Sequence, residues 1–149
     1  MNSRASRLVA IAGVALLLAA GISSAASPSV VKVLSLTPAA GSTVQSDTVL
    51  KAEVEYEIQV FEPKTTHYVL VPMFATTDGR GTFNHLQRAM DGKVLREQSG
   101  TVKITYPIRQ ELADSRLAKP IQCIFTLMHI KGGTILPVVS SNPIAYEVK

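Results

Sequence analysis

Apolar and polar residues alternate with great regularity along residues 49–58. The apolar members of this run are Leu50, Ala52, Val54, Tyr56 and Ile58. Lysine and glutamate occupy the positions between them. Successive side chains of a strand point to opposite faces, so a period of two places one set in a core and the other in water. The run therefore predicts a β-strand with one buried face.

Further strands are predicted in every part of the chain after the first 30 residues. The same alternation recurs at residues 101–108 and 144–148, and a short β-branched run occupies residues 30–36. Residues 67–75 and 121–130 are apolar on both faces, as expected for the central strands of a two-layer structure.

Turn-forming residues separate these runs. They occur at residues 38–41, 62–63, 78–81, 91–92, 99–100 and 131–133. Glycine supplies the positive φ of tight turns, and proline interrupts strand pairing. About seven short strands at this spacing predict an all-β fold, an antiparallel β-sandwich.

Helical patterns are weak by comparison. Phe83, Leu86 and Met90 have a spacing that fits one or two helical turns, but residues 86–90 and 93–97 fit a hairpin equally well. A further helical turn is expected around residues 110–117, where it would bridge two strands.

The first 26 residues read as a secretory signal. Arg4 and Arg7 precede an uncharged apolar run at residues 8–20, and small residues follow up to Ala26. The apolar run has 13 residues, whereas a membrane-spanning helix needs about 20. We expect cleavage after Ala25 or Ala26, which leaves no membrane span; the alternative is an uncleaved N-terminal anchor.

Removal of this signal changes the charge balance. The whole chain has 149 residues and a net charge of +4, whereas residues 27–149 number 123 and carry a net charge of +2. A single domain of this size is expected at residues 27–149. Nucleic-acid binding requires a concentrated basic face, which this nearly neutral segment lacks in its sequence, so we predict no nucleic-acid partner.

Two stretches resemble small exported bacterial immunoglobulin-like domains. Residues 36–44, Leu-Thr-Pro-Ala-Ala-Gly-Ser-Thr-Val, resemble the opening of such domains, in which a Pro-Gly kink lets the first strand cross between sheets. Residues 99–106 resemble their middle hairpin. The resemblance implies an immunoglobulin-like sandwich, here without the buried Trp and paired Cys of antibody domains.

The same opening is also similar to small periplasmic copper-binding proteins of the CopC type. Those proteins use a histidine near the mature N-terminus as a ligand, but the first histidine after residue 26 is His67. Met73, Met90 and Met128 are scattered, as core methionines often are. We therefore assign no metal ligand and keep a copper-binding function as the alternative.

Catalytic groupings are not apparent in the sequence. Cys123 and His129 fall on one predicted strand, about 20 Å apart, whereas a nucleophile and its base must lie about 3 Å apart. Cys123 is expected to be buried, and His129 to lie beside a loop. Because no nucleophile, base and acid can be assembled, we predict neither an enzyme nor a cofactor.

Glu53, Glu55 and Glu57 form a row of carboxylates along one strand face. Neighbours in such a row are about 7 Å apart, too far for two of them to hold one calcium ion unaided. We interpret the row as a solvated face, neutralised by cross-strand lysines such as Lys103.

The least regular segment, residues 78–98, is the predicted contact surface. Its cations and aromatic side chain are Arg80, Phe83, His85, Arg88 and Arg96. Loops on a rigid sandwich commonly carry binding. The alternative is an ordinary edge with Phe83 and Leu86 packed in the core.

We therefore expect an exported, non-catalytic binding or structural module that is periplasmic or secreted. Its expected partner is another envelope or extracellular protein.

Overall fold

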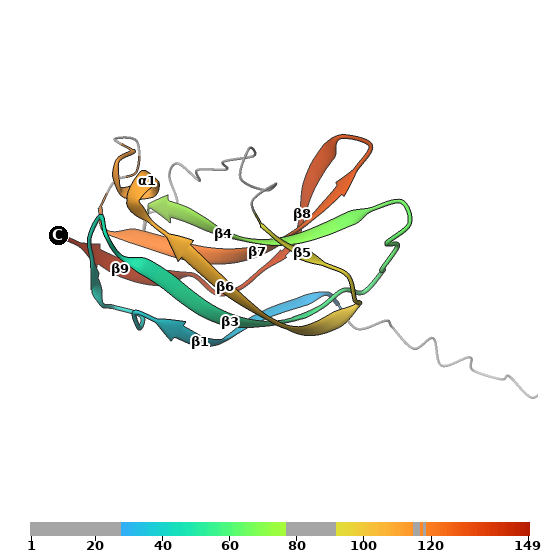
Figure 1. Cartoon of the computed structure of the whole chain (residues 1–149), viewed down its shortest axis with the longest axis horizontal. Helices are drawn as coiled ribbons and strands as arrows, with labels where there is room; N and C mark the ends of the chain where they lie inside the picture. The colour runs from blue at the N-terminus through green and yellow to red at the C-terminus, as the bar shows by residue number, and fades with distance from the viewer. Residues whose placement is uncertain (1–27, 77–91, 115–116, 118) are drawn as a thin grey trace, which may run out of the picture.

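The computed structural model describes residues 28–76, 92–114, 117 and 119–149 (Figure 1). In it, the alternating run forms strand β3 (Val49–Glu57). Leu50, Ala52 and Val54 on its inner face are at most 5% exposed. The glutamates on the opposite face are exposed or half-buried. The predicted strand and its buried face are confirmed. The predicted signal at residues 1–26 lies outside the described residues.

β3 is the centre of a three-stranded antiparallel sheet with the order β1-β3-β6. Its neighbours are β1 (Val30–Thr37) and β6 (Ser99–Pro107). A register shift between Val33 and Ser35 interrupts the pairing of β1. In contrast, β6 pairs with β3 without interruption over its whole length.

A second, larger sheet has the order β2-β9-β7-β4-β5, with β8 also paired to β7. Its strands are β2 (Thr43–Val44), β4 (His67–Thr76), β5 (Lys93–Leu95), β7 (Ile121–Lys131), β8 (Thr134–Ser140) and β9 (Ile144–Val148). All its pairings are antiparallel except that of β2 with β9, which is parallel. The chain passes from one sheet to the other between β1 and β2, through Pro38 and Gly41.

The two sheets form separate layers with a common core between them (Figure 1). Val54 of the smaller sheet and Phe125, Leu127 and Cys123 of the larger one are fully buried there. The fold is therefore mostly β, as predicted, and its core is dominated by aliphatic and aromatic side chains.

The two runs that are apolar on both faces are the central strands β4 and β7, which pair along ten residues. One face supplies the main core. The other holds a second small cluster of buried residues, Val69, Val71 and Met128. This two-sided burial confirms their predicted central position.

Two turn predictions have different outcomes. Gly132 and Gly133 have φ values of 57° and 81° and form the two-residue turn between β7 and β8, the geometry that glycine permits. By contrast, the turn predicted at Ser99 and Gly100 is wrong, because both residues begin β6, where Gly100 pairs with Tyr56. The Tyr56 ring lies against Gly100, with its Oη 3.4 Å from the position of a Cβ, and this cross-strand packing stabilises a glycine in a strand.

Short elements complete the fold. The helical turn expected near residues 110–117 is α1 (Arg109–Leu112), which links β6 to β7. β5 pairs with β4, while residues 86–90, its alternative hairpin partner, lie outside the described residues. The helix or hairpin predicted at residues 82–92 therefore stays a prediction.

A buried carboxylate joins α1 to β6. Glu111 is 2% exposed, and its Oε1 accepts a hydrogen bond of 2.6 Å from the Tyr106 hydroxyl. The Tyr106 ring stacks on Phe74 of the opposite sheet, with ring centroids 5.8 Å apart. Tyr106 therefore connects the helical turn and both sheets.

We expect the Tyr106–Glu111 hydrogen bond to be a strong one, because charge-assisted bonds contribute about 1.5–3 kcal/mol to stability. A double-mutant cycle of Tyr106→Phe and Glu111→Leu, each of which removes the bond, followed by urea unfolding, should give a coupling free energy in that range. Tyr146→Phe is the matched control, since the Tyr146 hydroxyl donates to the neutral Pro38 carbonyl oxygen at 3.0 Å. It should lower the free energy of unfolding by about 0.5–1.5 kcal/mol. A coupling near zero would contradict the prediction.

Candidate functional site

Among the predicted contact residues, Arg96 is the one that the structure describes. The residues Arg80, Phe83, His85 and Arg88 lie outside the described residues, so their prediction stays open. Arg96 is exposed and follows Leu95 at the end of β5, in the short link that carries the chain across to β6. It therefore lies beside the first residues of β6.

The Cys123 and His129 side chains lie at opposite ends of the β4–β7 pairing. In the strand register, Cys123 is paired with Phe74, and His129 is paired with Tyr68. Burial raises the pKa of the Cys123 thiol far above its ordinary value, which keeps it protonated and unreactive. The prediction of a buried thiol is confirmed. His129 lies near the end of β7, as expected, close to the turn at Gly132 and Gly133, and its side chain is half-buried.

The glutamate row of β3 faces cross-strand lysines. Glu53 pairs with Lys103 on β6, and Glu55 pairs with Lys32 on β1. Opposite charges at paired positions are mildly stabilising. The strand register therefore places lysines opposite two of the three glutamates, which supports the interpretation of this row as a solvated face.

Metal ligands are not gathered anywhere in the part of the chain that the structure describes. No group of three or more His, Cys, Asp or Glu side chains lies close enough there to hold an ion. Met128 is 2% exposed and packs against Val69 and Val71. Met90 lies outside the described residues.

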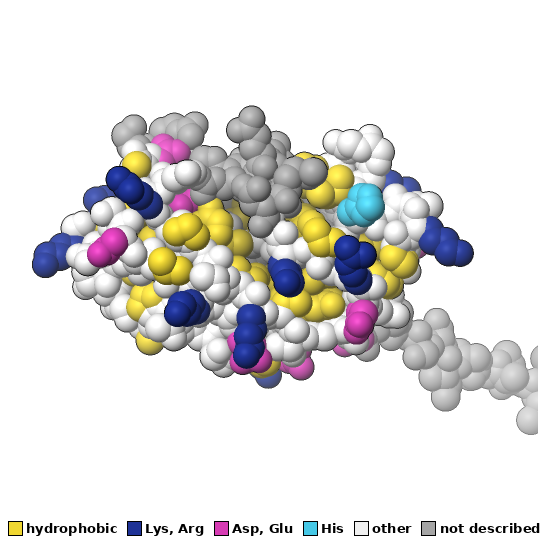
Figure 2. Space-filling model, in the orientation of Figure 1, with side chains coloured by type: hydrophobic (Ala, Val, Ile, Leu, Met, Phe, Trp, Pro, Cys, Tyr) yellow, Lys and Arg dark blue, Asp and Glu magenta, His cyan; other side chains and the backbone are white. Residues whose placement is uncertain are grey.

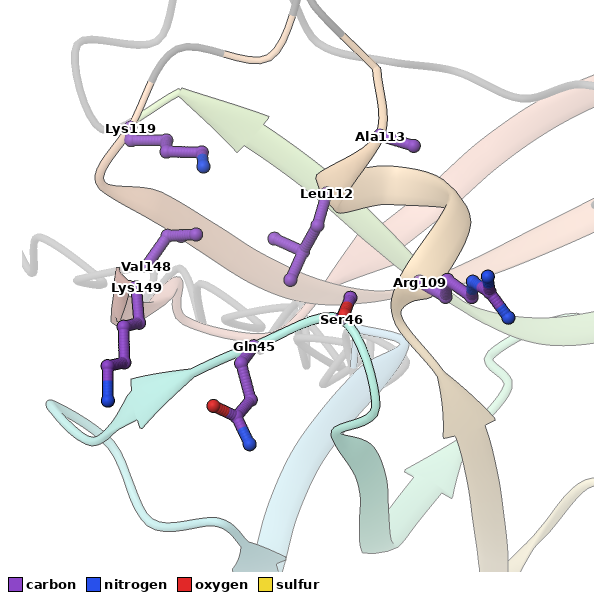
Figure 3. Close-up of a pocket in the computed structure, with 8 residues that line it drawn as sticks. All are labelled: Gln45, Ser46, Arg109, Leu112, Ala113, Lys119, Val148 and Lys149. Atoms are coloured by element: carbon purple, nitrogen blue, oxygen red, sulfur yellow. The ribbon is translucent and has the colours of Figure 1, made fainter.

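A pocket of about 560 Å³ lies at the end of the molecule near α1. Its lining residues are Gln45, Ser46, Arg109, Leu112, Ala113, Lys119, Val148 and Lys149 (Figure 3). The charged ends of the three cations point in different directions, with Arg109 directed away from the others. The pocket is therefore polar and basic, but its cations do not converge on one ligand position.

The free edge of β6 offers a more regular site. In an antiparallel pair, alternate residues direct both backbone N–H and C=O toward the neighbouring strand. The Gln98 carbonyl accepts from Ile58 N–H at 2.8 Å, and the Ile108 N–H donates to the Thr48 carbonyl at 3.2 Å. The backbone N–H and C=O groups of even-numbered β6 residues therefore point toward β3, and those of odd-numbered residues point outward.

The outward-facing positions of β6 are accessible. They are Ser99, Thr101, Lys103, Thr105 and Pro107, and each is exposed. In the described part of the chain, β6 pairs with β3 alone. From Ser99 to Thr105 the open edge is about 20 Å long.

Side chains on the inner face of β6 add an apolar margin to this edge. Ile104 is 9% exposed, while Val102 and Tyr106 are half-buried at the border of the core. Figure 2 shows hydrophobic side chains gathered along the front of the molecule, where β6 and β5 lie. An added strand would therefore find both backbone partners and apolar contacts.

The other outer strands are poorer templates. β5 has three residues and β2 has two. β1 and β8 each contain a register shift, and β8 also contains Pro137. Short strands, bulges, proline and charged side chains, lysine above all, are the features that protect sheet edges from pairing. β6 carries one such feature inside its open stretch, Lys103.

Comparison with known protein families, curated proteins and solved structures gave no match for this chain. Within the described residues, no helix has the length and apolar character needed to cross a membrane.

Sequence reasoning missed the β6 edge. Residues 101–108 were expected to form a strand, but the alternation of side chains does not reveal which strands end a sheet. Val102 and Tyr106, which border the edge, have the same pattern as residues of a central strand. The order of strands in the sheet was needed to find this site.

Proposed function

We propose that this chain is an exported, non-catalytic binding module with an immunoglobulin-like arrangement of strands. The strand orders β1-β3-β6 and β9-β7-β4-β5 support that arrangement. The change of sheet between β1 and β2 also fits the Pro-Gly kink expected from residues 36–44. Export rests on the secretory pattern of residues 1–26, and it implies a periplasmic or extracellular location.

The observation that carries the proposal is the open edge of β6. An extended segment of a partner can add to such an edge, where main-chain hydrogen bonds supply affinity and alternate side chains supply specificity. The partner is a protein with an extended, alternating segment. Its apolar residues contact Val102 and Tyr106, and its polar residues lie with Thr101, Lys103 and Thr105 on the solvated face. Arg96 stands beside the start of the edge and contributes a positive charge there.

Site-directed photocrosslinking in exporting cells tests this function. A photoreactive phenylalanine analogue at position 101 should form covalent adducts with a neighbouring protein chain, because Thr101 lies on the open edge. The matched control is position 55, since Glu55 pairs with Thr101 but belongs to the central strand. Equal labelling at both positions, or no adduct at position 101, would contradict the proposal.

A further inference from the structure

We propose that the partner strand is β6 of a second copy of this chain, paired antiparallel about a two-fold axis at Val102. This inference rests on the proposed function of the β6 edge and adds the identity and register of the partner. Such pairing joins the two smaller sheets into one, with the order β1-β3-β6-β6-β3-β1. It removes both exposed β6 edges at once.

The backbone limits the registers that are available. Residues that face each other across strands share one face of the sheet, and outward-directed groups must meet outward-directed groups. A two-fold pairing therefore places odd-numbered residues of β6 opposite odd-numbered residues. The registers near the middle of the strand are centred on Val102, Lys103 or Ile104.

Two of these registers contain a conflict. Centring on Lys103 places the two Lys103 side chains directly opposite each other, and like charges in that position are destabilising. Centring on Ile104 places Thr101 opposite Pro107, which has no N–H to donate.

The register centred on Val102 has neither conflict. Ser99 lies opposite Thr105, and Thr101 lies opposite Lys103, each twice because of the symmetry. All four outward N–H groups of each chain then have a carbonyl partner, since residues in a hydrogen-bonded pair exchange both of their bonds.

The side chains also fit this register. On the inner face, Val102 meets its own copy in a non-hydrogen-bonded pair, where side chains approach most closely. Ile104 lies opposite Gly100, whose missing side chain leaves the Tyr56 ring available for contact. A bulky residue therefore meets a position without a side chain.

On the outer face, no like charges lie directly opposite each other in this register. Thr101 stands between Glu55 of its own chain and Lys103 of the second copy. Lys103 in turn pairs with Glu53 of its own chain. Since the contact involves little more than one strand from each side, it is smaller than a standard interface, and we expect a weak, concentration-dependent dimer.

Sedimentation equilibrium of the exported chain tests the dimer and its register. Thr101→Lys places a second cation opposite Lys103, and because this contact occurs twice, it should weaken dimerisation by about 2- to 30-fold. Thr101→Glu should strengthen dimerisation by a similar factor. Thr105→Glu is the matched control, because Thr105 faces Ser99 in this register and its substitution should leave the dissociation constant nearly unchanged.

Thermal unfolding of the same variants separates association from folding. Within one chain, Thr101→Lys places a cation opposite Glu55, and Thr105→Glu places an acid opposite Lys51. Both should keep the monomer folded. Strengthening by Thr105→Glu instead of Thr101→Glu would overturn the register in favour of the one centred on Ile104.

A chain that stays monomeric up to millimolar concentration would overturn the second-copy proposal. If position 101 then still forms adducts with a different protein, the binding function stands with another partner. If position 101 forms no adducts either, the binding function fails as well.

Discussion

Replacement of Phe125 by alanine is expected to lower the free energy of unfolding by about 3–5 kcal/mol, the range for removal of a fully buried phenylalanine ring. Phe125 is 0% exposed and lies in the middle of the central strand β7. Small domains have a total stability of about 5–15 kcal/mol. The substitution should therefore remove a large fraction of the total stability of the domain.

The surroundings of Phe125 prevent the site from closing after the ring is lost. Its N–H donates to Ser141 Oγ at 3.0 Å, and its carbonyl accepts from Ser141 N–H at 2.8 Å. Because the backbone is held on this side and by β4 on the other, the cavity stays largely open, and open cavities give the largest losses.

Urea unfolding of Phe125→Ala and Phe61→Ala provides the measurement. Phe61 is half-buried and contacts Tyr68, with ring centroids 5.2 Å apart. The same substitution there removes less buried surface, so its effect should be clearly smaller. A loss at Phe61 equal to that at Phe125 would contradict the assignment of Phe125 to the centre of the core.

The second large effect is a loss of stability in alkali, caused by Cys123. Burial raises the pKa of this thiol above its ordinary value of 9.0 in the folded chain. Above pH 9 the unfolded chain releases the proton while the folded chain retains it, so the unfolded state is favoured as pH rises. The stabilisation that depends on the protonated Cys123 thiol is fully present below pH 9. Above pH 9 its loss lowers the free energy of unfolding by about 1.4 kcal/mol for each pH unit.

Tyr146 adds to this loss at higher pH. Burial raises the pKa of its hydroxyl above the ordinary value of 10.0. As for Cys123, the unfolded chain releases the Tyr146 proton at a lower pH than the folded chain does. The free energy of unfolding therefore falls further above pH 10. Stability should therefore fall in two stages, with a steeper slope in the second.

Urea unfolding at pH 8 to 11 measures both stages. By pH 11 the loss of stability caused by Cys123 alone should amount to about 3 kcal/mol. Cys123→Ala should flatten the slope between pH 9 and 10, and Tyr146→Phe should reduce it only above pH 10. An unchanged slope in Cys123→Ala would show that other groups cause the alkaline loss.

Most strands could be predicted because their side chains report burial directly. The alternation from Leu50 to Tyr56 predicted both the strand β3 and its inner face. β8 was missed because Pro137 and exposed apolar residues obscure its pattern. Its pairing depends on the Gly132–Gly133 turn, which places it beside β7. Likewise, Gly100 has the composition of a turn, but its contact with Tyr56 is set by a strand 44 residues earlier in the chain.

The candidate site depended even more on long-range arrangement. The direction of each backbone group of β6 follows from its register with β3, and the accessibility of Thr101 follows from the strand order. Neither is a local property of residues 99–107. Lys103 was identified in the sequence as a neighbour of the glutamates, but its role in choosing a register for an added strand required the structure.

The parallel pairing of β2 with β9 gives the fold a mechanical property. Three backbone hydrogen bonds connect residues 41–44 to the last strand: from Gly41 to Ala145, from Glu147 to Ser42 and from Lys149 to Val44, at 2.9, 3.1 and 3.1 Å. Once β1 has been pulled from β3, a force between the chain ends draws these parallel segments in opposite directions along their length. The bonds are then sheared together instead of being broken one after another. The domain therefore resists tension applied through its ends at this one short contact.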